Sequence, residues 1–298
     1  MELLSHYIEY QSKTHTEKEN WKNNIIGEGI SYSHRDTEYD RITYPSNLHY
    51  HDYYEVVIFE GGEVSYLSEG RVYYPKRGDI IIIPPRKFHM SVINSEKTRY
   101  IRHVFYLYPF AFDKIGHGIL TDFLKKVTAG ELFVFNNLED EQKFFEVLKS
   151  LSEVFDKELS HLENALGLSF VIQAFYLLNK ETLVSKNEKV LLPKNIMALK
   201  EYVDRNFDSI SSVTEVSNHF FYSREYVSRL FRKYFDTTIS DYIMKKRISK
   251  SQELIVKEGS IIDVAYQVGF GSLSTFIRAF KSVTGITPSE YRKLSKKS

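Results

Sequence analysis

The sequence predicts an α+β protein in two parts. An N-terminal antiparallel β-barrel or sandwich with a helical hairpin precedes an all-α C-terminal domain. Three observations lead to this fold class. Short apolar runs separated by turn residues fill positions 42–108, as in all-β sandwiches and barrels. Beyond about residue 117 the apolar residues recur with a helical period. The last hundred residues hold a weak internal repeat, and a chain of 298 residues has room for two domains.

The expected strands are short, and each ends at a recognisable turn. The first apolar run stops at Gly61 and Gly62, and another stops at Pro84. Turn signals at intervals of about ten residues favour antiparallel connections. The predicted strands cover residues 54–59, 63–67, 71–74, 80–83, 90–93 and 99–108.

Two antiparallel helices are expected after the strands, over residues 139–158 and 162–180. Each places large apolar side chains at helical spacing. Two interpretations stay open, and both can hold: the apolar stripes cover the barrel, or one of them pairs with a second copy of the chain. The stripe of the first helix consists of Phe144, Phe145, Leu148, Leu151 and Phe155.

Composition excludes several classes of protein. The chain has no cysteine, which excludes a disulfide scaffold, a thiolate nucleophile and a cysteine-ligated metal. The first twenty residues lack the apolar segment of a secretory signal. The longest unbroken aliphatic run is Ile80 to Ile83, far too short to span a membrane. We therefore expect a cytoplasmic protein.

The net charge of +1 hides an asymmetry between the two parts of the chain. Residues 193–298 carry 18 Lys and Arg against 11 Asp and Glu, a balance of +7, whereas residues 1–192 carry −6. A basic C-terminal part suggests a polyanionic partner.

The internal repeat consists of two copies in the basic part. Residues 212–217 match residues 260–265. Each copy predicts a short capped helix, a tight turn and a second helix, which is a helix-turn-helix. Ser212 and Ser260 are the expected caps, and Gly269 can supply a positive φ in the second turn. Further along, Arg229, Phe231, Thr238 and Tyr242 match Arg278, Phe280, Thr287 and Tyr291.

The second helix of each copy has one apolar and one polar face. An arginine fork can bind O6 and N7 of guanine, and small hydroxyl residues leave it room in a major groove. An arginine at matching positions in both copies favours DNA reading over an ordinary solvated surface. The polar faces carry Arg224, Glu225, Ser228, Arg229 and Arg232 in the first copy, and Ser274, Thr275, Arg278 and Lys281 in the second.

A longer helix is predicted over residues 240–257, with Ser240 as its cap and Gly259 as its stop. Its 18 residues span roughly 27 Å at 1.5 Å each. Such a strut suits two reading helices about one DNA turn apart, roughly 34 Å. We expect Lys245, Lys246, Arg247 and Lys250 on this helix to contact phosphates.

Residues 196–294 resemble the C-terminal DNA-binding domain of AraC/XylS-type transcription regulators. The most specific match is the run from Ile262 to Phe270, followed by Thr284-Gly285 and Thr287-Pro288. The resemblance implies a regulator that binds promoter DNA, responds to a small molecule and acts on RNA polymerase, usually as an activator. Its base-reading positions would fall on Glu225, Ser228 and Arg229, and on Leu273, Ser274, Thr275 and Arg278.

The strand region carries a second pattern: His49, His51 and Glu55, and later His89. Residues two apart on a strand point the same way, and His89 can close the set from a neighbouring strand. With Gly62, Gly78 and Pro84, this spacing resembles the two cupin motifs, which implies a cupin-like double-stranded β-helix.

Three uses of these side chains stay open. They could hold a divalent metal, as in a cupin metalloenzyme or a metal-sensing regulator. They could instead bind a small ligand such as a sugar without metal, or they could be partly exposed residues at a strand end with no ligand. We favour the metal-free ligand pocket, with Tyr44 and Tyr66 as stacking faces, and expect neither a cofactor nor catalysis. His103 and His117 are isolated in the sequence.

The sequence thus predicts four segments. An effector-binding domain is expected over 1–136 and a helical dimerisation region over 137–184. A linker over 185–194 leads to the double helix-turn-helix domain over 195–298.

Overall fold

The computed structural model describes residues 24–25, 29–41, 48–108, 133–135, 138, 140–155, 160–180, 190–257 and 259–295. These residues divide into two compact units, one within Glu17–Val190 and the other within Leu191–Ser298. We call them the sensor unit and the helical unit, and each is considered by itself.

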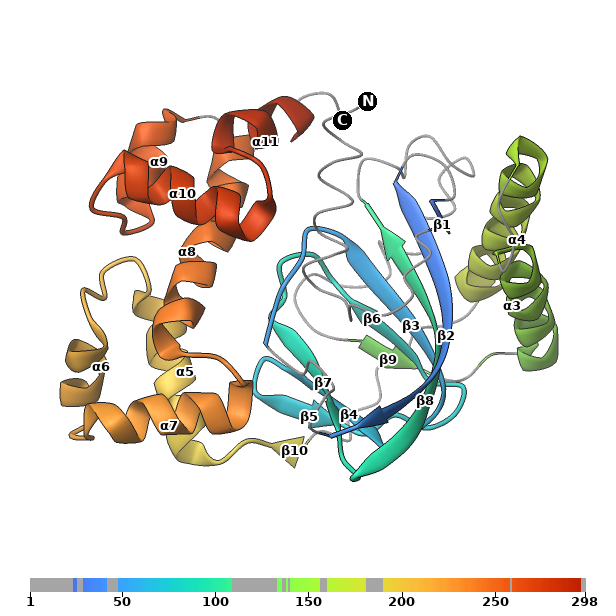
Figure 1. Ribbon diagram of the computed structural model, residues 1–298, viewed down its shortest axis with the longest axis horizontal. Coiled ribbons are helices and arrows are strands. Elements are labelled where there is room, and N and C mark those ends of the chain that lie inside the picture. The colour runs from blue at the N-terminus through green and yellow to red at the C-terminus, as the bar shows by residue number, and fades with distance from the viewer. Residues whose placement is uncertain are drawn as a thin grey trace. The chain divides into compact units, whose positions relative to one another are not determined.

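The sensor unit is built from two antiparallel sheets (Figure 1). The prediction of antiparallel strands is confirmed. Among the described strands the two sheets remain separate, so the predicted barrel is not closed. In spatial order the larger sheet contains β1 (Asn24–Ile25), β2 (Ile30–Asp40), β8 (Lys97–Leu107), β3 (Tyr54–Gly61), β6 (Ile80–Ile83) and β9 (Phe133–Phe135). The smaller contains β10 (Val190–Leu191), β5 (Arg71–Tyr73), β4 (Val64–Ser68) and β7 (His89–Ile93).

Strand β2 is a long element that sequence reasoning missed. It pairs with β8 over its whole length, from Ile30 opposite Leu107 to Asp40 opposite Lys97. Only its first three residues are buried, and the rest alternates between exposed and half-buried positions. The strand therefore has no apolar run, and its pairing with a distant segment is what defines it.

Two helices cover the outer face of the larger sheet, α3 (Glu141–Phe155) and α4 (His161–Lys180). Figure 1 shows them side by side next to the sheet. Alternate strand residues such as Val56 and Ile58 face the helices and share one core with them. The predicted stripe of α3 is confirmed, with Phe144, Leu148, Leu151 and Phe155 buried and Phe145 partly buried.

The helical unit contains the predicted double helix-turn-helix. Figure 1 shows α8 running from the first motif to the second. Among the described residues, no helix combines the length and apolar character needed to cross a membrane. The helices are α5 (Lys194–Asn206), α6 (Val213–His219), α7 (Arg224–Phe235), α8 (Ile239–Val256), α9 (Ile261–Gln267), α10 (Leu273–Thr284) and α11 (Pro288–Ser295).

Capping differs from the sequence prediction at two helices. Helix α8 has the predicted 18 residues, but Thr238 caps it by accepting a hydrogen bond from the Asp241 N–H. Ser240 therefore lies inside the first turn. Ser260 precedes α9 as expected, yet its side chain makes no capping bond. The Ser212 cap is confirmed, since its side chain accepts from Glu215 N–H.

The turns of the two motifs require a left-handed residue. Gly269 holds φ at 90° in the second turn, as the sequence predicted, and Phe221 holds φ at 55° in the first. A Cβ at Gly269 would lie 2.0 Å from the backbone oxygen of Asp208. Only glycine satisfies both the angle and the contact without moving the backbone.

We therefore expect Gly269→Ala to lower the free energy of unfolding of the helical unit by about 2–4 kcal/mol, from left-handed strain and steric overlap. Urea unfolding followed by circular dichroism measures this loss. Gly271→Ala is the matched control, because a Cβ there meets nothing within 4 Å, and its change should stay within about 0.5 kcal/mol. Equal losses in both variants would contradict the interpretation.

Candidate nucleic-acid interface and ligand site

The polar face of α7 is open to solvent. Arg224, Glu225, Arg229 and Arg232 are exposed and Ser228 is half-buried, whereas Val227, Leu230, Phe231 and Phe235 on the opposite face are buried. Ser223 caps the helix by accepting from Tyr226 N–H. The amphipathic pattern thus fixes which side of α7 packs and which side is presented outward.

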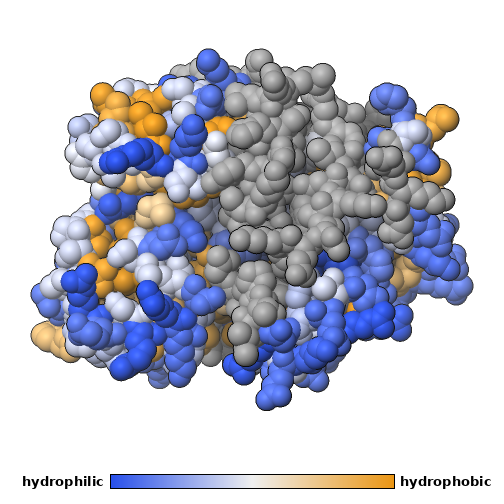
Figure 2. Space-filling view, viewed as in Figure 1, coloured by the Kyte–Doolittle hydropathy of each residue, from blue (hydrophilic) through white to orange (hydrophobic). Residues whose placement is uncertain are grey.

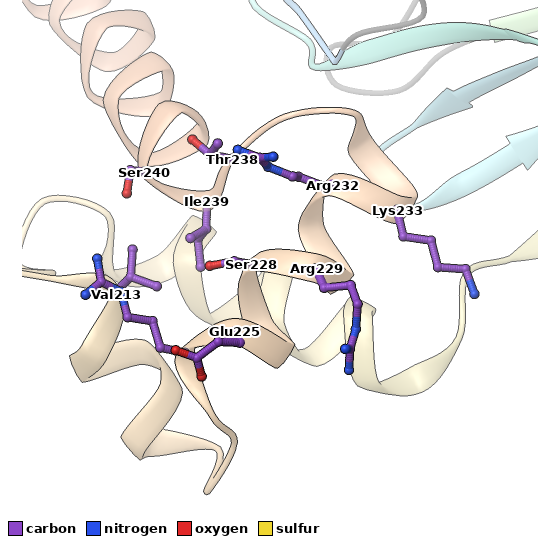
Figure 3. Close-up of a pocket in the computed structure, with 10 residues that line it drawn as sticks. Val213, Glu225, Ser228, Arg229, Arg232, Lys233, Thr238, Ile239 and Ser240 are labelled. Atoms are coloured by element: carbon purple, nitrogen blue, oxygen red, sulfur yellow. The ribbon is translucent and has the colours of Figure 1, made fainter. Parts of the chain in front are cut away.

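This face lines an open pocket between α6, α7 and the start of α8, and the pocket has a volume of about 790 Å³. Figure 3 shows Glu225, Ser228, Arg229 and Arg232 of α7 around it. Sequence reasoning missed the other contributors, because they come together only in the folded motif. These are Lys233 from α7, Val213 from α6, and Thr238, Ile239 and Ser240 from the start of α8.

Helix α10 presents a similar face in the second motif. Ser274, Thr275, Arg278 and Lys281 are exposed, and Leu273 is half-buried. Phe276, Phe280 and Thr284 are buried on the inner side. The Ser272 hydroxyl, which caps the helix by accepting from Thr275 N–H, also donates a hydrogen bond to the Thr275 hydroxyl oxygen at 2.9 Å. Both matching arginines, Arg229 and Arg278, are therefore accessible.

The four basic residues expected to contact phosphates from α8 have partners inside the helical unit. Lys245 pairs with Asp241 at 3.0 Å, and Lys250 with Glu253 at 2.9 Å. Lys246 lies 3.0 Å from Asp204. Arg247 donates to the carbonyl oxygens of Phe207 at 2.8 Å and Ile210 at 2.7 Å. The sequence pattern did not reveal these contacts, and phosphate contact by the four residues stays a prediction.

In the sensor unit, three of the four predicted ligand-site groups come together. The Nε2 atoms of His51 and His89 each lie 3.2 Å from Oε2 of Glu55. We call these three residues the inner cluster. His49 is joined to His89 by a backbone bridge, and their ring centroids are 4.3 Å apart. Glu55 lies on the side of β3 opposite to Val56 and Ile58, so the cluster faces away from the helices.

Backbone contacts fix the tautomers of the inner cluster. Nδ1 of His51 lies 2.8 Å from the carbonyl oxygen of Tyr53, and Nδ1 of His89 lies 2.9 Å from that of Lys87. A carbonyl oxygen only accepts, so each Nδ1 carries a proton and each Nε2 of a neutral ring is an acceptor. Neutral rings would therefore present two acceptors beside the carboxylate of Glu55.

Burial disfavours the charged form of both His51 and Glu55. Burial lowers the pKa of His51 and so favours the neutral ring. Burial by itself would raise the pKa of Glu55, but hydrogen bonds that the Nε2–H groups of His51 and His89 donate when those rings are protonated outweigh burial and hold that pKa well below its usual range. The inner cluster therefore suits a ligand that donates hydrogen bonds, or a cation.

Of the two tyrosines predicted as stacking faces, the structure describes only Tyr66. Tyr66 is buried, and its hydroxyl is hydrogen-bonded to that of Tyr100. Tyr44 lies outside the described residues. Stacking of a ligand on either ring stays a prediction.

A second cluster was missed by sequence reasoning. His34, Glu60 and His103 come together, and the interpretation of His103 as isolated is wrong. His34 lies on β2, the strand that was not predicted, so its pairing with His103 could not be seen. His117 lies outside the described residues. We call His34, Glu60 and His103 the outer cluster, and like the inner cluster they could hold a metal ion.

The two units thus define a sensor joined to a double helix-turn-helix reader, the architecture of a transcription regulator. Comparison with known families agrees. Residues 34–136 match the AraC-like ligand binding domain, and residues 216–294 match a helix-turn-helix domain. The chain belongs to the AraC family of DNA-binding transcriptional regulators.

Relatives cover either the whole chain or its helical unit. An uncharacterized HTH-type transcriptional regulator, YfiF of Bacillus subtilis, is 29% identical over 86% of this chain and 81% of its own length. Regulatory protein SoxS of Salmonella typhimurium is 34% identical over 33% of this chain and 92% of its own length. Transcriptional activator RhrA of Rhizobium meliloti is 38% identical over 35% of this chain and 34% of its own length.

Among solved structures, ToxT from Vibrio cholerae O395 aligns with 91% of this chain and 98% of its own, at 17% identity and a TM-score of 0.36.

Proposed function

We propose that this chain is a cytoplasmic, small-molecule-responsive activator that reads promoter DNA with α7 and α10. The observation that carries the proposal is the pair of exposed arginines, Arg229 and Arg278, at matching positions of two helices whose opposite faces are buried. Activation is supported by the relative RhrA, a transcriptional activator by name. Contact with RNA polymerase is part of the same proposal.

The two faces divide the work of recognition. Arg229 and Arg278 are assigned to guanine edges, where a guanidinium fork can take O6 and N7 together. Glu225 can accept from the N4 amine of cytosine, while the hydroxyls of Ser228, Ser274 and Thr275 leave room and add contacts. Leu273 is assigned to a thymine methyl group. Arg224, Arg232 and Lys281 are assigned to phosphates.

The inner cluster is our proposed effector site. It offers acceptors on His51, Glu55 and His89, which suit a compound rich in hydroxyl groups such as a sugar. The Melibiose operon regulatory protein of Escherichia coli, 23% identical over 83% of this chain, carries a sugar in its name. No comparison favours the metalloenzyme alternative, and we infer that the chain acts by binding rather than by catalysis.

Helix α4 is our proposed dimer surface. Leu162, Leu166 and Tyr176 are 83%, 47% and 53% exposed, although other α4 residues such as Phe175 join the core. Apolar residues reach the surface near this helix (Figure 2). A second copy of the chain would cover them.

For the DNA contacts, we expect Arg278→Ala to weaken binding to a selected operator by about 1–3 kcal/mol and to relax preference at one base pair. Arg232→Ala should weaken all sequences alike and reduce the salt slope by about one unit. Fluorescence anisotropy on operator variants, selected first from random DNA, measures both effects. Arg205→Ala is the control, because Arg205 is exposed on α5, outside both faces. Equal weakening of every sequence by Arg278→Ala would contradict the base-reading assignment.

For the effector site, a panel of mono- and disaccharides should contain a compound that raises the melting temperature of the full chain. A ligand present at 100 times its Kd adds about 2.7 kcal/mol to the free energy of unfolding. Glu55→Gln should abolish that shift, because it removes the ionised acceptor. His161 lies at an exposed position of α4, so His161→Gln should retain the shift. A shift unchanged in Glu55→Gln would place the ligand elsewhere.

For the dimer, the double variant Leu162→Glu/Leu166→Glu should be monomeric at concentrations where the unmodified chain is dimeric, since it puts two charges into an apolar contact. Sedimentation velocity measures this difference. Lys149→Glu adds the same side chain at an exposed position of neighbouring α3 and should leave the dimer intact. Persistence of the dimer in the double variant would rule out α4 as the interface.

A further inference from the structure

The outer cluster brings three possible ligands of a transition metal, two imidazoles and one carboxylate, onto one surface of the sensor unit. Oε1 of Glu60 lies 2.8 Å from Nε2 of His103 and 3.6 Å from Nε2 of His34. Two ligands bound at 2.0–2.1 Å to a tetrahedral ion are about 3.4 Å apart, and the two observed distances bracket that value. The three donor atoms all lie within 4.8 Å of one another.

The sheet itself builds this arrangement. His34 and His103 are direct cross-strand partners on β2 and β8, a position in which Cβ atoms are about 4.5–5.5 Å apart and two imidazoles can reach one ion. The β3–β8 register shifts between Phe59 and Gly61. Glu60 is the extra residue of that bulge, and bulges commonly re-aim a side chain beside a functional site.

Groups behind the cluster can hold His103 in the form that binds metal. Nδ1 of His103 lies 2.6 Å from the hydroxyl of Tyr32. That hydroxyl can donate its own proton to the carbonyl oxygen of Leu148 in α3, at 3.5 Å. Nδ1 then donates to Tyr32, and when a metal ion replaces the proton on Nε2, the Nε2 lone pair can bind that ion beside Glu60. A ligating histidine commonly donates its second N–H to such a partner.

Access differs among the three side chains in the way an open metal site requires. The His103 side chain is 5% exposed, Glu60 is 21% exposed and His34 is 33% exposed. The buried His103 would therefore hold the ion on its protein side, and the ion would reach the site from solvent on the side of His34. Water would complete its coordination, as at zinc sites with three protein ligands.

We propose that His34, Glu60 and His103 form a binding site for a divalent transition metal of the zinc class. The donor set is two imidazoles and one carboxylate, which suits Zn²⁺ better than Mg²⁺ or Ca²⁺. The site is separate from the inner cluster, because the two lie on opposite faces of β3. Through Tyr32 and Leu148 it adjoins α3, so metal binding would stiffen the contact between the sheet and the helical hairpin.

The test uses the full-length chain, freed of metal with a chelator and titrated with Zn²⁺ against a chromophoric competitor. Co²⁺ serves as a spectroscopic substitute, since four- or five-coordinate cobalt gains a visible absorption. We expect His34→Gln to weaken binding of one Zn²⁺ by at least about 100-fold, since losing even an outer-shell partner of a ligand can cost that much. Glu60→Gln, which keeps the side-chain volume, should behave in the same way.

Controls separate this site from other histidines. Glu55→Gln disrupts the inner cluster and should retain the outer-cluster metal, as should His161→Gln on α4. His34 is partly exposed, so the metal-free His34→Gln variant should keep the melting temperature of the unmodified chain. The proposal is overturned if the unmodified chain binds no Zn²⁺ when about 100 μM free Zn²⁺ is present without the competitor. Such a result would mean a dissociation constant well above about 100 μM. It is also overturned if Glu55→Gln removes the metal while His34→Gln retains it.

Discussion

The guanidinium of Arg247 is the group on which the geometry of the helical unit depends. It sits midway along α8 and donates to the carbonyl oxygens of Phe207 and Ile210, between α5 and α6. The same group lies 5.8 Å from the ring of Phe270 in the second turn. One side chain thus connects both motifs to the strut, and lysine could not replace its rigid fork of donors. Reading two grooves requires such fixed spacing, because base contacts tolerate little displacement.

In the sensor unit, the alternation of side chains along a strand determines which residues reach a ligand site and which pack in the core. On β3, Glu55 belongs to the inner cluster on one face, while Val56 and Ile58 face the helical hairpin on the other. Glu60 stays on the hairpin side at the bulge beside His103. A strand with period two can therefore serve a ligand site on one face and a packed core on the other. Apolar burial on the helix side supplies stability, which leaves the opposite face free to carry charge.

Sequence reasoning succeeded where local pattern decides structure. Amphipathic spacing located α7 and α10 with their exposed arginines, and motif spacing located the inner cluster. Sequence reasoning failed where contacts between segments far apart in the chain determine the structure. Strand β2 has no apolar run, so the pairing of His34 with His103 was invisible. A sequence also does not show that Lys246 of α8 meets Asp204, and phosphate contact by the α8 cations stays a prediction. The four segment boundaries stay predictions.

The shared strand limits how an effector could act on the hairpin. Glu55 and Glu60 belong to one β3, which pairs with β8 from Tyr54 to Gly61. A ligand moves an equilibrium only by its difference in affinity for two states. An effector held by the inner cluster would therefore act on α3 only if one state of β3 and β8 both favours its contacts and changes the packing of Val56, Ile58 and His103. A metal in the outer cluster would bias the same strands from the opposite face, and by linkage each ligand would change the affinity of the other by the same factor.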